Sequence, residues 1–237
     1  MIFKSIIIQI FLFYFVIPIY SQILNIGTQK TFGGTTSDII SRSISTSDGG
    51  IIVAGSSTSG ISGDKTENNR GGTDFWVVKF DSNLSVEWQK TIGGSSGDNA
   101  YDIKETIDGG FIVVGPSASG ISGDKTSANI GGNDYWIVKL NSIGTIIWDK
   151  SYGGIGSDIL NSIIIDSMGN IYLGGHSDSG ISGNKTEASR GFSDYWIIKL
   201  DSSGNQLWDK TIGGSSSENF RDFVLKDNGE IIIYGMS

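Results

Sequence analysis

The stretch Asp-Tyr-Trp-Ile-Val-Lys-Leu, residues 134–140, decides how this chain folds. It recurs 60 residues earlier as Asp-Phe-Trp-Val-Val-Lys-Phe (74–80) and 60 residues later as Asp-Tyr-Trp-Ile-Ile-Lys-Leu (194–200). Aromatic and β-branched residues favour strands, and successive side chains of a strand point to opposite faces. A strand of this composition is therefore apolar on both faces, and the sheet around it must be covered on both sides.

The rest of the chain keeps the same 60-residue period, without insertion or deletion. All six tryptophans fall in two series with this spacing, which are Trp76, Trp136, Trp196 and Trp88, Trp148, Trp208. Gly-Gly pairs recur at Gly33/Gly34, Gly93/Gly94, Gly153/Gly154 and Gly213/Gly214. Self-similarity at a fixed period is the signature of repeat architectures. Because both tryptophan series lie within predicted strands, we expect core packing rather than sugar stacking.

One repeat contains four predicted strands. They span Asp98–Thr106, Phe111–Gly115, Asp134–Leu140 and Thr145–Ser151. The Asp108-Gly109 pair suits the positive φ of a tight hairpin turn. We therefore predict an all-β fold of tandem four-stranded antiparallel blades, stacked face to face as in a β-propeller. A β-solenoid or an open stack of sheets is the alternative.

The strand count predicts an incomplete or open ring. The segment Ile23 to Phe32 matches a fourth strand, three full units follow, and Ile231 to Gly235 matches a second strand. That is about 3.5 copies, or about 15 strands where four blades of four need about 16. The chain is then a piece of a longer array, a small imperfect ring, or one that pairs with another copy. Open blade edges also favour self-association.

The first 21 residues resemble a signal peptide. Lys4 is followed by a long apolar run that ends at the small residue Ser21. We predict cleavage there, leaving a β-propeller-like repeat domain over residues 22–237, and a secreted or cell-surface protein. A retained membrane anchor is the alternative. No second hydrophobic stretch follows, so we expect no membrane span after cleavage.

Composition excludes several kinds of chemistry. The formal net charge is −8, with no cluster of Lys and Arg, which argues against nucleic acid as a partner. The absence of cysteine rules out disulfides, thiolate zinc sites and thiol nucleophiles. The one histidine, His176, is predicted to be a surface-loop residue, since Ser56 and Pro116 take its place in other copies. We predict no enzymatic activity and no cofactor.

Acidic residues recur just before the first and third strands, and we interpret them as turn elements whose carboxylates bind nearby backbone N–H groups. They are Asp38, Asp98, Asp158 and Glu218 in one series and Asp74, Asp134 and Asp194 in the other. Calcium bound by loop carboxylates is a weaker alternative, because the Asp-x-Asp-x-Asp pattern is missing. A hydrolase using Asp98 or Asp158 is the third reading. Lys79, Lys139 and Lys199 are expected to pair with acids.

A long insert between the second and third strands exceeds what folding needs. Its motif Ser-Gly-Ile-Ser-Gly-Asp-Lys-Thr spans residues 59–66 and recurs at 119–126 and 179–186. In a propeller these inserts and the Gly-Gly segments cluster on one face, and long ordered loops are often functional. The candidate binding-face residues are Asp64, Lys65, Asp124, Lys125, Asn184 and Lys185. The favoured alternative is structural, with Ile61, Ile121 and Ile181 as a plug on the blade and Asp64, Asp124 and Asn184 closing the loop.

The unit resembles the bacterial β-propeller repeats of the SBBP type. The matching positions are Gly93-Gly94, Asp98, Asp108-Gly109, Phe111 to Gly115, Tyr135 to Leu140 and Gly144. The likeness covers Gln29 to Gly235, and the insert Ser117 to Asn133 departs from it. The resemblance implies an extracellular or surface module of a Gram-negative bacterium, frequently part of a larger protein, without enzymatic activity.

These observations predict a non-enzymatic extracellular scaffold that presents its loop-rich face to a protein or glycan partner. The alternative is a structural fragment of a larger secreted or surface-anchored protein whose activity lies in another domain.

Overall fold

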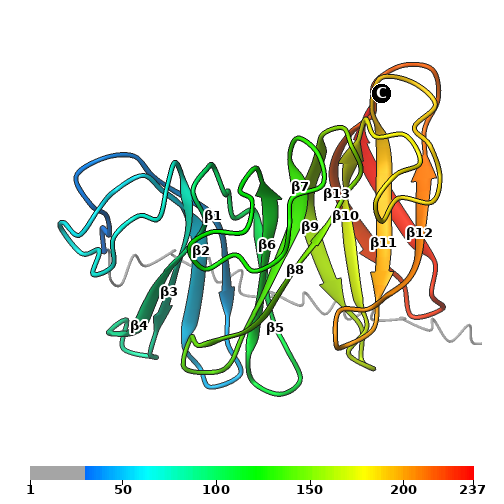
Figure 1. Ribbon diagram of the computed structural model, residues 1–237. Helices are drawn as coiled ribbons and strands as arrows, with labels where there is room; N and C mark the ends of the chain where they lie inside the picture. Colours follow the sequence, from blue (N-terminus) through cyan, green and yellow to red (C-terminus); the bar gives the residue numbers. More distant parts are fainter. Residues whose placement is uncertain (1–29) are drawn as a thin grey trace, which may run out of the picture. The chain divides into compact units, whose positions relative to one another are not determined.

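The structure is a computed structural model that describes residues 30–237 (Figure 1). The predicted leader and nearly all of the strand predicted over residues 23–32 lie outside the described residues. The chain divides into two units, Met1–Thr31 and Phe32–Ser237, and every described strand belongs to the second. Residues 30–237 contain no helix long and apolar enough to cross a membrane.

The described residues form three four-stranded sheets and one two-stranded sheet, all antiparallel. In sequence order the strands are β1 (Asp38–Ser45), β2 (Ile51–Ser57), β3 (Asp74–Phe80), β4 (Val86–Ile92), β5 (Asp102–Glu105), β6 (Phe111–Ser117), β7 (Asp134–Leu140), β8 (Ile146–Tyr152), β9 (Asp158–Ile165), β10 (Ile171–Ser177), β11 (Asp194–Leu200), β12 (Gln206–Ile212), β13 (Asn219–Leu225) and β14 (Ile231–Met236). Within each sheet the strands lie in chain order. The predicted all-β fold of tandem antiparallel blades is confirmed, and the four sheets are the blades of an open, propeller-like arrangement.

The predicted strands of the second repeat agree closely with β6, β7 and β8, but its first strand is shorter than predicted. β5 begins at Asp102, whereas Asp98 forms only an isolated bridge with Ser117. At the equivalent place in the first sheet, the register between β1 and β2 shifts between Ile40 and Arg42. A bulge of this kind leaves one residue unpaired and increases the local twist of the strand.

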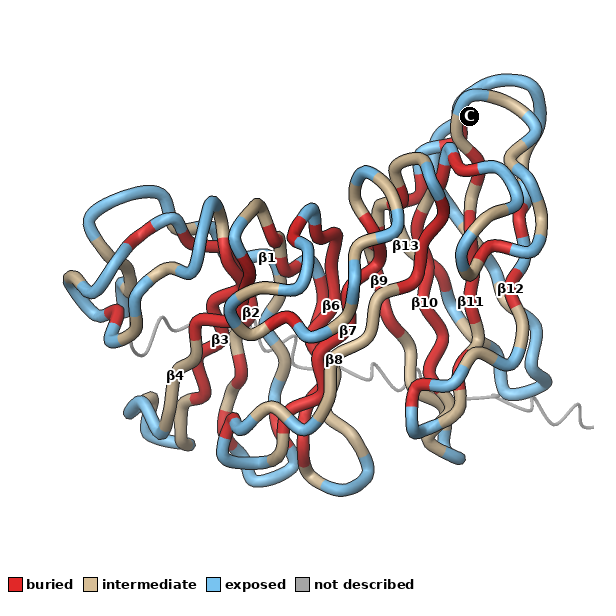
Figure 2. Tube along the Cα trace, in the orientation of Figure 1, coloured by how far each residue is buried: buried red, intermediate tan, exposed pale blue. Residues whose placement is uncertain are grey.

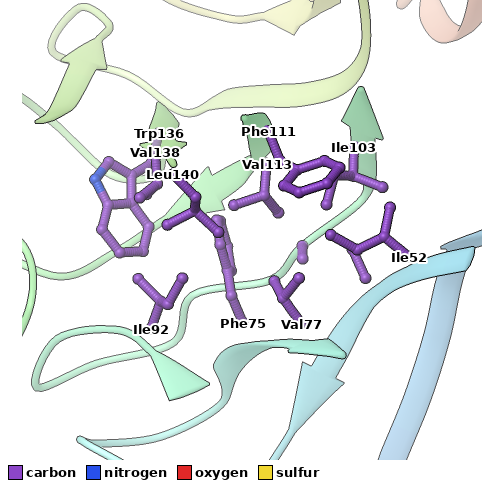
Figure 3. Close-up of a cluster of buried hydrophobic side chains, with 12 residues drawn as sticks. Ile52, Phe75, Val77, Ile92, Ile103, Phe111, Val113, Trp136, Val138 and Leu140 are labelled. Atoms are coloured by element: carbon purple, nitrogen blue, oxygen red, sulfur yellow. The ribbon is translucent and has the colours of Figure 1, made fainter. Parts of the chain in front are cut away.

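The core lies between the blades. One cluster of buried side chains joins the first and second sheets, another the second and third, and a third the third and fourth. The central strands of each complete sheet are buried while the connecting loops are exposed (Figure 2). In Figure 3, Ile52, Phe75 and Val77 of the first sheet face Phe111, Val113 and other side chains of the second.

Aromatic contacts repeat at each blade interface. The ring centroids of Phe75 and Trp136 lie 4.8 Å apart, and those of Tyr135 and Trp196 are also 4.8 Å apart. Trp136 and Trp196 are fully buried. Aromatic pairs at this separation contribute beyond the area they bury. The predicted core packing is confirmed for Trp136 and Trp196, which lie between neighbouring blades.

The second tryptophan series is only half-buried and covers the turns of the next blade. The Trp88 Nε1–H donates to the Ser142 carbonyl oxygen at 3.0 Å. Gly144 in that turn has a φ of 80°, and a Cβ there would lie 2.7 Å from the Trp88 ring. Glycine is therefore required at this position both by the backbone conformation and by the tryptophan above it.

The first strands of the four blades meet through a polar network, which we call the axial network. It consists of Arg42, Asp102, Ser162 and Asp222, each 60 residues from the next. Arg42 Nε lies 2.8 Å from Asp102 Oδ1, and Ser162 Oγ donates to Asp222 Oδ1 at 2.7 Å. The backbone N–H of Ile163 also donates to Asp102, at 3.1 Å. The first strands of successive blades are therefore in direct polar contact with one another.

We expect Asp102→Ala to lower the free energy of unfolding by about 2–3 kcal/mol, because it leaves buried donors without acceptors. Urea unfolding followed by circular dichroism measures the change. Asp227→Ala, in an exposed turn, is the control and should stay within about 0.5 kcal/mol of the wild type. Equal effects of the two substitutions would contradict a structural role for the axial network.

Candidate functional site

Each insert folds back onto the Gly-Gly segment that precedes its blade. The backbone N–H of Asp64 donates to the Gly33 carbonyl oxygen at 2.9 Å, and a side-chain oxygen of Asp64 accepts from the Gly33 N–H at 3.1 Å. Asp124 makes the same two contacts with Gly93, at 2.8 and 3.3 Å. Asn184 repeats them in the third insert, on the Gly-Gly pair of its own blade. The prediction that these three residues close the loop is confirmed.

Insert serines bind the same glycine-rich segments, as the second insert shows. Ser122 Oγ accepts from the Ser95 N–H at 2.8 Å, and Ser119 Oγ accepts from the Ser96 N–H at 2.9 Å. The tip of the insert is a tight hairpin in which Ser122 and Lys125 exchange backbone hydrogen bonds, with Gly123 at a φ of 57°. The inserts and the glycine-rich segments therefore form one continuous surface, which we call the loop face.

Three of the predicted binding-face residues are not on the surface. The side chains of Lys65, Lys125 and Lys185 are buried, with at most 2% exposed. Their ammonium groups donate to the hydroxyl oxygens of Thr91, Ser151 and Thr211, respectively. Because a buried ammonium group is out of a partner's reach, the interpretation of these lysines as binding residues is corrected.

The buried lysines anchor the inserts to the blade core. The Nζ atom of Lys125 lies 5.1 Å from the centre of the Trp136 ring, a cation–π distance. Burial lowers the pKa of Lys125 to about 8, although Asp149, Asp98 and Asp134 act in the opposite direction. The same cause lowers the pKa of Lys65 and of Lys185. The insert is therefore held on the blade by packing of a lysine side chain against a tryptophan ring, and not by an isoleucine as predicted.

The isoleucines of the inserts point outward rather than onto the blade. Ile61, Ile121 and Ile181 are 62%, 69% and 71% exposed. The predicted isoleucine plug is therefore wrong, because the lysine four residues later in each insert is the side chain buried against the blade. Each insert instead presents an exposed apolar side chain on the loop face.

The periodic acids are turn elements, as predicted. Asp98 Oδ2 accepts from the Gly94 N–H at 2.7 Å and from Ser119 Oγ at 2.8 Å. Asp134 Oδ2 accepts from the Ile130 N–H at 2.6 Å. Asp98 and Asp158 are fully buried. In this position they hold the glycine-rich segments in place and are shielded from a substrate.

Several of these periodic Asp residues each have one buried carboxylate oxygen without a hydrogen-bond partner. Within residues 30–237 these atoms include the Oδ1 of Asp74, Asp98, Asp134 and Asp158. Burial raises the pKa of Asp74 and of Asp134 to about 6, and it also raises the pKa of Asp158. No group of three or more His, Asp or Glu side chains that could hold a metal ion occurs in the described part of the chain. Calcium binding stays an untested alternative.

His176 lies inside β10 and not in a surface loop, so that prediction is wrong. Its side chain is half-buried, its Nδ1 has no partner among residues 30–237, and burial lowers its pKa. The predicted pairing of core lysines with acids is confirmed at Lys79, whose Nζ lies 2.9 Å from Asp48 and 2.8 Å from Glu87. Lys139 pairs with Asp108 at 2.7 Å.

The junctions between successive inserts differ from one another. Between the first and second inserts, Arg70 Nε lies 2.9 Å from Asp124 Oδ2. At the next junction the corresponding residues are Ile130 and Asn184, and a Cβ on Gly183 would lie 2.9 Å from the Ile130 side chain. An ion pair is thus replaced by an apolar contact.

Two further departures from the repeat lie at that same junction. Ile155 occupies the position held by Ser95 and Ser215 and is 74% exposed, and its N–H donates to Ser182 Oγ at 2.9 Å. Asp178 is exposed, and its carboxylate accepts from the Ser157 N–H at 2.5 Å. We call Ile130, Ile155, Ile181 and Asp178 the junction patch. Sequence reasoning missed it because it looked for what the repeats share, whereas the signal is where one repeat differs.

Comparison with known proteins gives one distant relative. The chain is 22% identical over 223 residues to the Regulatory protein FlaEY of Caulobacter vibrioides. The match covers 87% of this chain but only 22% of the length of that protein. No protein-family model matches the chain.

Lowering the pH from about 7.5 to about 5 is expected to stabilise the protein through the buried carboxyls. The folded-state pKa of Asp134, about 6, lies above its ordinary value of 3.8, so in this window the folded chain takes up a proton that the unfolded chain does not. Stability from this group is therefore gained as the pH falls through 6 and lost as it rises. His176, whose pKa is lowered, acts in the opposite direction.

Asp134→Asn isolates the contribution of the Asp134 carboxyl to the pH dependence of stability, because an amide does not titrate and still accepts from the Ile130 N–H. We expect the melting temperature of Asp134→Asn to rise less between these two pH values than that of the wild type. Asp227→Asn is the control. An identical pH dependence in Asp134→Asn and wild type would show that this carboxyl does not titrate in the window.

Proposed function

We propose that this chain is a non-enzymatic scaffold that binds a protein partner through its loop face, at the junction patch. The observation that carries the proposal is the exposure of aliphatic side chains on ordered loops. Ile130, Ile155 and Ile181 are 36%, 74% and 71% exposed and come together at one junction between inserts. Contiguous exposed apolar side chains with polar surroundings are typical of protein interaction sites.

Different residues of the inserts hold the loop structure and face the solvent, and this supports the proposed binding role of the junction patch. The residues shared by the three inserts are used internally, since Lys125 anchors the loop, Asp124 closes it and the serines hold the glycine-rich segment. In the junction patch, the side chains of Ile130, Ile155 and Ile181 are exposed, whereas Asp178 also accepts from the Ser157 N–H. Because every insert has an isoleucine equivalent to Ile181, this junction is distinguished by Ile130, Ile155 and Asp178, which depart from the repeat.

A protein partner fits this surface better than a glycan. Sugars stack on exposed aromatic faces, whereas the tryptophans of the repeat are buried or half-buried within strands. Aliphatic side chains instead bury against apolar side chains of another protein. The exposed carboxylate of Asp178 beside Ile155, on a chain of net charge −8, favours a partner with a basic residue next to its apolar one.

We further propose where in the cell this protein acts. The leader-like residues 1–21 and the resemblance to SBBP-type repeats support a secreted or cell-surface protein of a Gram-negative bacterium. The second candidate is a structural segment of a larger protein whose activity lies in another domain. It is favoured by the match to only 22% of a longer relative, whose name describes a regulatory protein.

A display selection with a random peptide library tests the proposed binding face. We expect enriched peptides that combine apolar residues with Lys or Arg. Their affinity should fall about tenfold or more in Ile155→Ser and in Ile181→Ser, since burying one such side chain contributes about 1.5–3 kcal/mol. Titration calorimetry with the enriched peptides gives the comparison.

Ile121→Ser is the matched control, because Ile121 has the same exposure and the same place in its insert but lies at the charged junction. Peptides whose affinity falls equally in Ile121→Ser and Ile181→Ser would show that the junction patch has no special role. A selection that enriches no peptide for the loop face would remove the support for a protein-binding scaffold.

A further inference from the structure

The second insert differs from the other two at the place where its buried lysine is anchored. The hydroxyl oxygen that accepts from this lysine belongs to Ser151, whereas Thr91 and Thr211 hold the same position in the first and third sheets. Ser127 lies beside Ser151, where the other two inserts have a glutamate. Since both serines occur only in the second repeat, the architecture that all three repeats share does not require them.

The hydroxyl group of Ser151 is also more open to solvent than its equivalents. Thr91 and Thr211 are 2% exposed, whereas Ser151 is only half-buried. The glutamates of the first and third inserts accept from the backbone N–H groups of these two threonines, at 2.9 and 3.0 Å. In the second insert the shorter Ser127 takes the place of the glutamate, and a hydroxyl group beside a buried lysine can be reached from solvent.

Four polar side chains are connected around this hydroxyl group. Lys125 Nζ donates to Ser151 Oγ and lies 3.1 Å from Ser127 Oγ, and the two serine oxygens lie 2.9 Å apart. Ser127 donates its own hydroxyl proton to Asp149 Oδ2 at 2.6 Å. Because this proton is already used, Ser127 Oγ acts as an acceptor toward Lys125 and Ser151.

The surroundings of Lys125 favour loss of a proton from its ammonium group. The side chain is 1% exposed, and among residues 30–237 its hydrogen-bond partners are the two serine hydroxyls and not a carboxylate. Burial lowers its pKa to about 8. In the neutral form, Nζ has a lone pair that can accept the hydroxyl proton of Ser151, as a base does when it activates a serine nucleophile.

We infer that Ser151 and Lys125 form a nucleophilic pair that accepts an acyl group from an activated carboxylic ester. Ser151 Oγ bonds to the carbonyl carbon of the ester while its proton passes to the neutral Nζ of Lys125. The bond between that carbon and the alcohol oxygen breaks, and Lys125 returns the proton to the departing alcohol. The acyl group stays on Ser151 as an ester, so the reaction modifies the scaffold and is not a catalytic cycle.

Ser127 and Asp149 are positioning residues in this arrangement. When Ser127 Oγ accepts from an N–H of neutral Lys125, the lone pair of Nζ is left for the hydroxyl proton of Ser151. Asp149 fixes the direction of the Ser127 hydroxyl, and the same carboxylate oxygen accepts from Trp136 Nε1 at 3.0 Å. The participating side chains come from the insert, β7 and β8, so the arrangement exists only in the folded blade.

The activated ester p-nitrophenyl acetate tests the inference on the full chain, with peptide mapping by mass spectrometry to measure the rate of acetylation at each serine. We expect Ser151 to react at least about a hundredfold faster than Ser203, which lies in an exposed turn, because a positioned base accelerates such steps by about 10²–10⁴. The rate at Ser151 should level off above about pH 8, where Lys125 has lost its proton, whereas the rate at Ser203 should continue to rise.

Ser127→Glu restores the residue of the other two inserts and is the informative variant. It should slow acetylation of Ser151 about tenfold or more, since it removes the acceptor that orients Lys125. Ser202→Ala, in an exposed turn, is the control and should leave the rate at Ser151 unchanged. Because Lys125 also anchors the insert, the pH profile rather than a Lys125 variant tests its role as the base.

Three results would each overturn the inference. They are equal rates of acetylation at Ser151 and Ser203, a rate at Ser151 that keeps rising with pH in parallel with that at Ser203, and an unchanged rate at Ser151 in Ser127→Glu. Since none of these measurements involves a binding partner, their outcome is separate from that of the proposed function.

Discussion

Each third strand of the repeat is apolar on both faces, and this condition governs how the blades are arranged. Trp136 of β7 packs on Phe75 of the preceding blade, while Tyr135, one residue earlier and on the other face, packs on Trp196 of the following one. A single sheet of this kind would expose a row of large side chains on each side. The free-energy cost of that exposure is roughly 25 cal/mol per Å² of apolar surface. The blade therefore becomes stable only between two neighbours. Among residues 30–237, the first and the fourth blades each share a buried cluster with only one neighbouring blade.

The same packing explains why the loop face can vary. Because the strands and the buried lysines fix the position of each insert, some residues at the junctions between inserts, such as Arg70 and Ile130, can differ from repeat to repeat. The first junction uses this freedom for an ion pair between Arg70 and Asp124, and the second uses it for exposed isoleucines. The Asp carboxylates beneath the loop face are the cost of this construction, since burial disfavours their charged form and raises the pKa of Asp134 to about 6.

Much of the fold could be predicted from residue patterns alone. The aromatic and β-branched composition of residues 134–140 and the Asp108-Gly109 turn are local signals, and both correspond to what the structure contains. The site was harder to predict, because its features depend on contacts between distant residues. A buried Lys125 contradicts the usual exposure of lysine and becomes reasonable only when Ser151 and the Trp136 ring are beside it. The exposed Ile121 is the converse case, since its apolar character alone pointed to burial.

A double-mutant cycle between Phe75 and Trp136 tests the central claim most directly, because these residues lie 61 positions apart and meet only if neighbouring blades stack face to face. The free energy of unfolding is measured for wild type, Phe75→Leu, Trp136→Phe and the double variant. Stacked blades predict a coupling of about 1 kcal/mol between the two substitutions. Effects that add within about 0.3 kcal/mol would contradict direct packing of one blade on the next.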